Sequence, residues 1–425
     1  MEELALKNRV SESEILRAVG RSVFFTGFSF FFIDFYIQIL GVALGASALE
    51  IGSFTAIVFV AQVFSNPLAG YLADRLGRRA TLAFGGFSRV ISLVLVGVAF
   101  DLSSGTLITL GRLVQGIAAG FFWTSSFAVV ADETEAGGRS QEFGRITLWV
   151  NRGMLVGALG GYALLLLRLD APPYFFAFAA VVSGVFALGI HPKLMDSNLL
   201  ASKAIRPDYG QVLNRKSASA GLAIINAVNP AGVLVMSSFL IVYVTQTVFP
   251  ASEPVSARAL YIAIASAPQV VLSAFFSPML ARFADRHGRF VPLMISMVAT
   301  IPVTFGLIYI TQLWQLAILG FMLALTGIVF GAAFNALVGD LYRDSRGSAY
   351  GGLNMFNSIG AALGSTLGGI LYPMGWAIVI GASTFIQALS LSGLFMIRKA
   401  YRTIPLVEVP LPLGSSLTGQ PGTGD

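Results

Sequence analysis

The sequence predicts an all-α integral membrane protein, with twelve transmembrane helices in two parallel six-helix repeats around a central cavity. Of the 425 residues, 56% are apolar and only 11% are charged, and the mean hydropathy is +0.78, which is outside the usual range for a soluble domain. Apolar runs of about 20 residues, the length that crosses a bilayer as a helix, recur along the chain without the alternation of a β-barrel. A charged segment between two such runs recurs 211 residues later.

The twelve predicted spans divide into two groups of six. Residues 1–191 are predicted to form the N-terminal bundle, 192–218 a basic linker, and 219–400 the C-terminal bundle. The tail 401–425 is rich in Pro, Gly, Ser and Thr, so we expect it to be disordered. Residues 1–18 lack the pattern of a cleaved signal, which leaves the first span as the expected insertion signal. In order, the predicted spans are 19–43, 50–73, 80–101, 104–130, 146–168, 173–191, 219–247, 258–281, 291–310, 313–339, 348–372 and 374–397.

The net charge of +6 does not indicate a nucleic-acid partner, because the basic residues follow the predicted topology. Apart from Arg112, Arg168 and Arg258, the Lys and Arg residues fall in segments or span ends that face one side of the membrane. The positive-inside rule makes that side the cytoplasm. Both termini and the linker are therefore predicted to be cytoplasmic.

The residues that most enzymes and metal sites use are scarce. The chain has no cysteine and two histidines, His191 and His287, which excludes disulfides, thiolate metal sites and cysteine nucleophiles. No nucleophile–base pair, metal cluster or phosphate-binding loop is evident. We therefore predict that the protein is not an enzyme and uses no metal or other cofactor.

The repeated charged segments are residues 70–79 and 281–290, and each follows a long apolar run. They share one register, and Asp132 and Asp340, which end the fourth and tenth predicted spans, are a further matched pair 208 residues apart. An internal duplication in parallel orientation explains both offsets. Asp74 lies at a helix end, where a neighbouring helix N-terminus and guanidinium groups would stabilise its carboxylate. The eleventh span begins on the same side, near 347–350.

The repeated segment resembles the G-x-L-a-D-r-x-G-r-r/k signature of the Major Facilitator Superfamily, and the resemblance covers essentially residues 15–400. It implies a membrane transporter in which this motif holds the cytoplasmic gate shut. The alternative is that the charges form only a solvated, positive-inside turn. Because the second copy departs from the pattern at Ala281, Phe283 and Phe290, we expect a weaker second latch. The matching gate residues are Gly70, Asp74, Arg75, Gly77, Arg78, Asp132, Asp285, Arg286, Gly288, Arg289 and Asp340.

Asp34 and Arg112 are the charged residues predicted to couple transport to protons. Asp34 lies within the first span, where a carboxyl costs roughly 2.5–3.5 kcal/mol and is functional by default. Burial could keep it protonated near neutral pH. Arg112 begins a sequence that resembles the family's R-x-x-Q-G motif, whose arginine is linked to proton coupling, and an ion pair between the two is plausible. The alternatives are an Asp34 that reaches the headgroups and an Arg112 that snorkels outward.

A set of aromatic and amide side chains is predicted to line the cavity. Arg112, Gln115 and Trp123 share a helix face, and the phenylalanines of the first span would suit hydrophobic or cationic substrates. The amides could equally bridge helices. Arg89 and Arg152 are expected to snorkel to the membrane surface. The predicted cavity residues are Phe31, Gln38, Gln115, Trp123, Asn226, Asn229, Asn335, Asn354 and Asn357.

Glycines of the fifth span resemble a motif of drug/proton antiporters, although Ala158 replaces its proline and Tyr162 its last glycine. These departures weaken the antiporter assignment, and close helix packing is the default explanation of the glycines. Our hypothesis from the superfamily resemblance and the aromatic first span is a proton-coupled transporter that works by alternating access and exports small hydrophobic or cationic compounds. The alternative is a proton symporter or uniporter that imports a sugar or organic anion. The proton gradient would supply the energy, and the partners would be a small-molecule substrate and the lipid bilayer. We expect a monomer in the plasma membrane.

Overall fold

The computed structural model describes residues 2–30, 47–102, 104–166, 216–249, 255–342 and 346–401. Within these ranges the chain is helical and contains no strand. The predicted span 173–191, nearly all of the predicted linker and nearly all of the predicted tail lie outside the described residues. The α-helices are α1 (Glu2–Phe30), α3 (Ala48–Leu76), α4 (Arg78–Asp101), α5 (Gly105–Asp132), α6 (Arg139–Leu166), α9 (Lys216–Thr247), α10 (Val255–Arg286), α11 (Phe290–Gly306), α12 (Leu313–Leu341), α13 (Arg346–Leu371) and α14 (Trp376–Tyr401).

Eight of these helices are long and apolar enough to cross a membrane, namely α3, α4, α5, α9, α10, α11, α12 and α14. Helix α13 is not among them although its 26 residues have spanning length. Its sequence is rich in Gly, Ser and Asn, and it buries many of these residues against neighbouring helices. Helices that face other helices need less apolar surface than those that face lipid, so a hydropathy criterion misses them.

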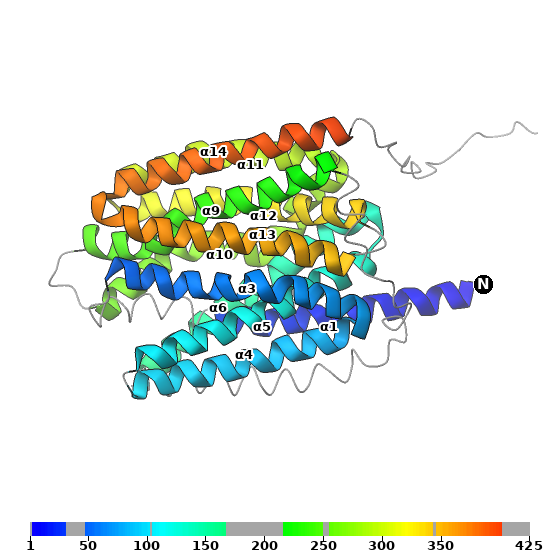
Figure 1. Cartoon of the computed structure of the whole chain (residues 1–425), viewed down its shortest axis with the longest axis horizontal. Coiled ribbons are helices and arrows are strands. Elements are labelled where there is room, and N and C mark those ends of the chain that lie inside the picture. The colour runs from blue at the N-terminus through cyan, green and yellow to red at the C-terminus, as the bar shows by residue number, and fades with distance from the viewer. Residues whose placement is uncertain are drawn as a thin grey trace, which may run out of the picture.

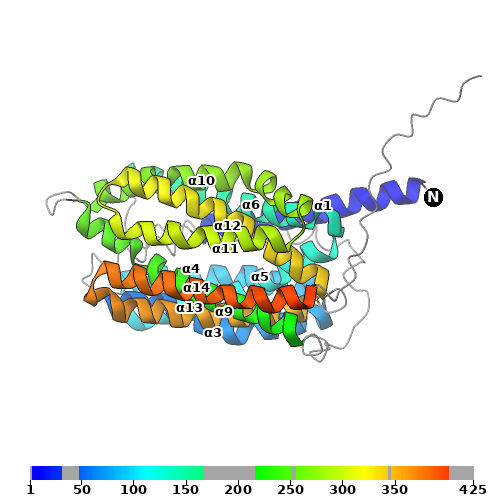
Figure 2. The same cartoon turned by 90° about the horizontal axis from the view of Figure 1, so that it is seen from above.

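The long helices lie side by side along one direction (Figure 1). The view from above separates them into two layers, with α10 and α12 in one and α3, α9, α13 and α14 in the other (Figure 2). The N-terminal and C-terminal halves of the sequence meet mainly where α3 packs on α13 and where α6 packs on α10. We call these contacts the first seam and the second seam. The duplication relates them, because the offset of 211 carries α3 onto α10 and the offset of 208 carries α6 onto α13.

Small residues let the helices approach closely at both seams. A Cβ atom on Gly70 would lie 2.5 Å from the backbone oxygen of Gly347, and one on Gly144 would lie 2.6 Å from Cβ of Ala281. Side chains at these positions would push the helices apart, so glycine sets the spacing of each seam.

Candidate functional site

The first cluster of charges lies where α3 ends and α13 begins. The Asp74 carboxylate accepts hydrogen bonds from the backbone N–H of Ser348 at 2.8 Å and from its hydroxyl at 2.6 Å. Arg78 donates to Asp74 at 2.5 Å and to Asp132 at 3.1 Å, and Arg346 donates to Asp132 at 3.0 Å. We call these five residues the first latch. It joins the two halves of the chain through the helix N-terminus that the sequence predicts near 347–350.

A sharp turn brings Arg78 back to Asp74. Gly77 has φ of 96°, and its register match Gly288 has φ of 76°. An L-residue with a side chain rarely adopts this conformation, so glycine at both positions permits the turn that starts the next helix. The repeated glycine of the motif is therefore explained by backbone geometry.

The second latch repeats the first with the halves exchanged. Asp285 accepts from the backbone N–H groups of Ser140 at 3.2 Å and Gln141 at 3.0 Å, at the start of α6. Arg289 donates to Asp285 and, at 3.2 Å, to Asp340, and Arg139 also donates to Asp340.

The second latch has as many charged contacts as the first, so the expectation of a weaker second latch stays a prediction. Ala281, one of the departures from the motif, packs against Gly144 rather than near a carboxylate. The other charged residues of the motif point elsewhere. Arg75 is exposed and contacts Tyr71, and Arg286 is exposed.

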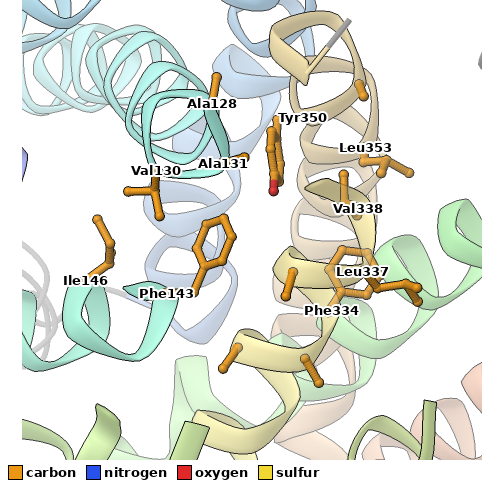
Figure 3. Packing of buried hydrophobic residues seen from close by; sticks show 14 of the residues in the cluster. Ala128, Val130, Ala131, Phe143, Ile146, Phe334, Leu337, Val338, Tyr350 and Leu353 are labelled. Carbon is orange, nitrogen blue, oxygen red and sulfur yellow. The ribbon is translucent and has the colours of Figure 1, made fainter. Parts of the chain in front are cut away.

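A buried apolar cluster lies beside the two latches and joins both halves (Figure 3). The ring centroid of Phe127 lies 5.6 Å from that of Trp123 and 5.9 Å from that of Tyr350, and Phe143 lies 6.1 Å from Tyr350. Tyr350 is almost fully buried and donates to the backbone oxygen of Asn335 at 2.6 Å. We call Trp123, Phe127, Phe143 and Tyr350 the aromatic plug. Its rings come from α5, α6 and α13, so it joins the two halves at this end of the seam.

Sequence reasoning found Trp123 but missed the rest of the aromatic plug. The chain contains 34 phenylalanines, and most positions in such a sequence could equally face lipid. A signal was available only for Tyr350, which follows the predicted start of the eleventh span at 348, whereas Phe143 lies before the predicted start of the fifth span at 146.

Arg112 is buried in α5, with 3% of its surface exposed. Its Nε donates to the backbone oxygen of Phe54 at 3.0 Å, and its Nη1 donates to Gln115 at 2.6 Å. The alternative of outward snorkelling is therefore wrong. Asp34, Phe31 and Gln38 lie outside the described residues, so the predicted ion pair between Asp34 and Arg112 stays a prediction.

Two arginines that were expected to snorkel bond inside the protein instead. Arg89 of α4 is 5% exposed and donates to the Ser29 hydroxyl at 2.6 Å. Arg152 of α6 donates to the backbone oxygen of Ala274 in α10 at 2.9 Å. A snorkelling side chain keeps its charge in water, whereas both of these guanidinium groups bind to neighbouring helices. The sequence shows an arginine in an apolar run but not the partner it meets.

Asn66 forms a polar contact across the first seam that the sequence did not reveal. It is 2% exposed, and its amide donates at 2.9 Å both to the backbone oxygen of Asn354 and to the Ser358 hydroxyl. Thr124 lies 3.4 Å from its amide oxygen. A buried amide must find such partners, so Asn66 fixes the register of α3 against α13. The sequence offered one sign of this contact. Asn66 lies four residues before the first charged segment and is followed directly by a proline.

The remaining predicted cavity residues have different surroundings. Asn226 is buried and donates to the backbone oxygen of Leu353 at 2.6 Å, so it bridges α9 and α13. Asn357 lies 3.5 Å from Asn226. Asn354 accepts from Asn66 through its backbone, and Asn335 accepts from Tyr350 in the same way. Asn229 is half-buried in α9. The bridging role, one of the two open alternatives, is thus directly visible for Asn226.

A cavity of about 700 Å³ lies near the latches between α1, α5 and α6, within the N-terminal half. Trp149, Ile146 and Glu142 contribute to its wall. Burial raises the pKa of Glu142, against the opposing effect of Arg145, which pairs with it at 2.7 Å. In the described part of the chain, no group of three or more His, Asp or Glu side chains could hold a metal ion.

Comparison with known proteins assigns the family. The sequence model of the Major Facilitator Superfamily matches residues 21–308 and 231–414. The chain belongs to the Major Facilitator Superfamily. Members of the superfamily are membrane transporters and need no cofactor. The chain is 25% identical over 355 residues to the multidrug resistance protein MdtG of Salmonella arizonae, covering 79% of this chain and 82% of the relative. The MdtG protein of Salmonella choleraesuis is equally similar, which favours the drug/proton antiporter branch of the superfamily.

Solved structures of superfamily members share the fold at low sequence identity. The human organic anion transporter MFSD10 superposes with a TM-score of 0.67 at 14% identity, covering 91% of this chain and 99% of that protein. The proton:xylose symporter XylE gives 0.67 at 16% identity, with coverages of 92% and 96%. The protein therefore has the twelve-helix, two-repeat fold of the superfamily.

Proposed function

We propose that this superfamily member is a proton-coupled exporter of small hydrophobic or lipophilic cationic compounds that works by alternating access. The two latches and the aromatic plug would form the gate at one end of the pathway. The distribution of Lys and Arg supports a cytoplasmic location for that end and for both termini. The structure would then be a state closed towards the cytoplasm. The bacterial relatives favour the plasma membrane, and one chain holds both repeats, so we propose a monomer.

The main observation in favour of hydrophobic or cationic substrates is the aromatic plug. Trp123, Phe127, Phe143 and Tyr350 bring rings from both halves together directly beside the gate. Aromatic faces bind apolar surfaces and attract cations, but they offer few hydrogen bonds to a sugar. The similarity to the multidrug resistance protein MdtG supports the same class.

We assign proton coupling to Asp34, with Arg112 as its positioning partner. Arg112 is held rigidly by Phe54 and Gln115 inside the bundle, where a fixed positive charge would stabilise an ionised carboxyl nearby. Binding and release of the proton would then depend on how close the two groups are in each state of the transporter.

The alternative is a symporter or uniporter in which Arg112 binds an anionic substrate. Its guanidinium group already donates to protein groups, namely Phe54 and Gln115. This favours the exporter.

The decisive experiment is to measure pH changes inside proteoliposomes when lipophilic cations, sugars or organic anions are added to the purified protein. Proton movement opposite to a lipophilic cation, lost in Asp34→Asn, would support the proposal. Proton movement together with a sugar or an anion would support the symporter. Unchanged proton-driven transport by Asp34→Asn would remove the coupling role.

A further inference from the structure

Arg152 makes a contact between the halves at the second seam, away from the charged latches. It lies in α6, 13 residues after the helix begins at Arg139. Its Nε donates at 2.9 Å to the backbone oxygen of Ala274, which belongs to α10 and therefore to the other half. A charged side chain inside a membrane span costs free energy. The bond of Arg152 to the opposite helix therefore needs a physical explanation.

The Ala274 carbonyl is available because of a proline. In an α-helix this oxygen would accept from the N–H four residues later, and that residue is Pro278, which has none. A carbonyl left unpaired in the membrane interior costs several kcal/mol. Arg152 supplies the missing donor, so a charged hydrogen bond between the halves replaces a hydrogen bond within one helix.

Two aromatic rings hold the guanidinium group in place. It lies 5.5 Å from the ring centroid of Trp149 in its own helix and 5.3 Å from that of Phe275 in α10. Both distances are within cation–π range. The aromatic contacts therefore come from the two halves, like the hydrogen bond.

The first seam lacks this arrangement although the duplication repeats the proline. Pro67 of α3 is the register match of Pro278. The match of Arg152 is Gly360, where a Cβ atom would lie 1.7 Å from the backbone oxygen of Ala227 in α9. A side chain cannot fit there, and the polar contact across the first seam comes from the Asn66 amide, which donates to the backbone oxygen of Asn354 in α13 and not to the carbonyl that Pro67 frees. The arginine contact is thus specific to the second seam.

We propose that Arg152 is a positioning residue for the transport cycle, which ties α6 to the proline-freed carbonyl of α10 and so stabilises the state with both latches closed. Opening the latch end separates α6 from α10 near this point and breaks the tie. The bond then opposes opening, and its strength sets part of the balance between the two states of the transporter.

The experiment uses Pro278→Ala to separate this role from a purely structural one. Alanine restores the N–H that pairs with Ala274 within α10. In Arg152→Met the carbonyl loses its donor, so thermal stability and the closed state both decrease. In Arg152→Met/Pro278→Ala the carbonyl is paired again and stability recovers, but the tie between the halves is still missing.

The absence of cysteine from the sequence allows spin labels at Gly137→Cys and His287→Cys to report the distance across the latch end by pulsed electron paramagnetic resonance. Both positions are exposed. In Arg152→Met and in the double variant, we expect the ratio of open to closed molecules to rise about tenfold, as for the loss of one charge-assisted hydrogen bond.

Two outcomes would overturn the proposal. If the double variant regains the wild-type distance distribution along with its stability, Arg152 only repairs the helix. If Arg152→Met leaves the distribution unchanged, the tie has no effect on the gate. Pro67→Ala is the control for removing the matched proline, and it should leave the ratio near that of the wild type. Should Arg152→Met fail to fold, the double variant still gives the result, because its α10 has no unpaired carbonyl.

Discussion

Single carboxylates connect the two halves of this transporter. Asp74 accepts from Arg78 in its own half and from Ser348 in the other, and Asp285 does the same with Arg289 and Ser140. Each carboxylate therefore has one partner in its own half and one in the other half, and in the proposed cycle only the second partner leaves when the latch opens. When only the bonds to the opposite half break, each carboxylate keeps its arginine partner, so no buried charge is left unpaired. The free-energy cost of opening then stays comparable to ordinary binding energies.

Glu142 should make the stability of the protein depend on pH. Burial raises its pKa above the ordinary value of 4.5, so the ionised form disfavours the folded state at neutral pH, and this effect is absent once the group is protonated in both states. Glu142→Gln should therefore unfold at a higher temperature than the wild type at neutral pH, with the difference disappearing at a pH below 4.5. Thermal unfolding in detergent at the two pH values measures this.

Arg145→Gln is the matched control, because it removes the charge that lowers the pKa of Glu142. It should destabilise the protein at neutral pH. A Glu142→Gln variant with the same stability change at both pH values would contradict the assignment.

At the scale of helices, glycines decide how close the seams can come. Gly351 and Gly352 are neighbours in α13 with opposite surroundings. A Cβ atom on Gly351 would lie 2.6 Å from the backbone oxygen of Asn66, whereas one on Gly352 would meet nothing within 4 Å. Glycines that pack at the seam and glycines that face open space therefore differ in their contacts although they look alike in the sequence.

Gly351→Ala should weaken the closed state, because the added methyl group pushes α3 away from α13, at a cost of about 1–3 kcal/mol. Gly352→Ala should be neutral or stabilising by up to about 1 kcal/mol, since alanine favours a helix and has room here. The labelled cysteine pair that reports on the latch end, together with thermal unfolding, compares the two variants. Equal effects of both would show that the seam tolerates a wider spacing.

At the scale of the molecule, the proposed mechanism has both latches act on one equilibrium between closed and open arrangements of the halves. If the halves move as rigid bodies, removing one latch should leave the contribution of the other unchanged. Asp74→Asn and Asp285→Asn should each raise the open-to-closed ratio about tenfold, by loss of hydrogen bonds to a charged group, and the two factors should multiply in the double variant. A double variant no more open than either single one would show that the two latches are coupled, so that losing one already removes the contribution of the other.

Much of this architecture could be predicted from the sequence, because long apolar runs indicate spanning helices and the charged segment occurs twice. The register match of Asp74 with Asp285 located both latches. Contacts between distant helices were out of reach. Nothing in the sequence pairs Arg152 with Ala274 or Asn66 with Asn354, because an apolar run does not show which neighbour a polar side chain will meet. Arg89 was misjudged for the same reason.

The two latches have one further consequence, which concerns ancestry. In the first latch an aspartate of the N-terminal half binds the start of a helix in the C-terminal half, and in the second latch the matched residues exchange places. This is the reciprocal pattern of a two-fold symmetric dimer interface. A six-helix precursor could have formed both contacts by pairing with an identical copy, so gene fusion required no new interface. The contacts without a counterpart, Arg112 and Arg152 among them, would then date from after the fusion, when the halves were free to diverge.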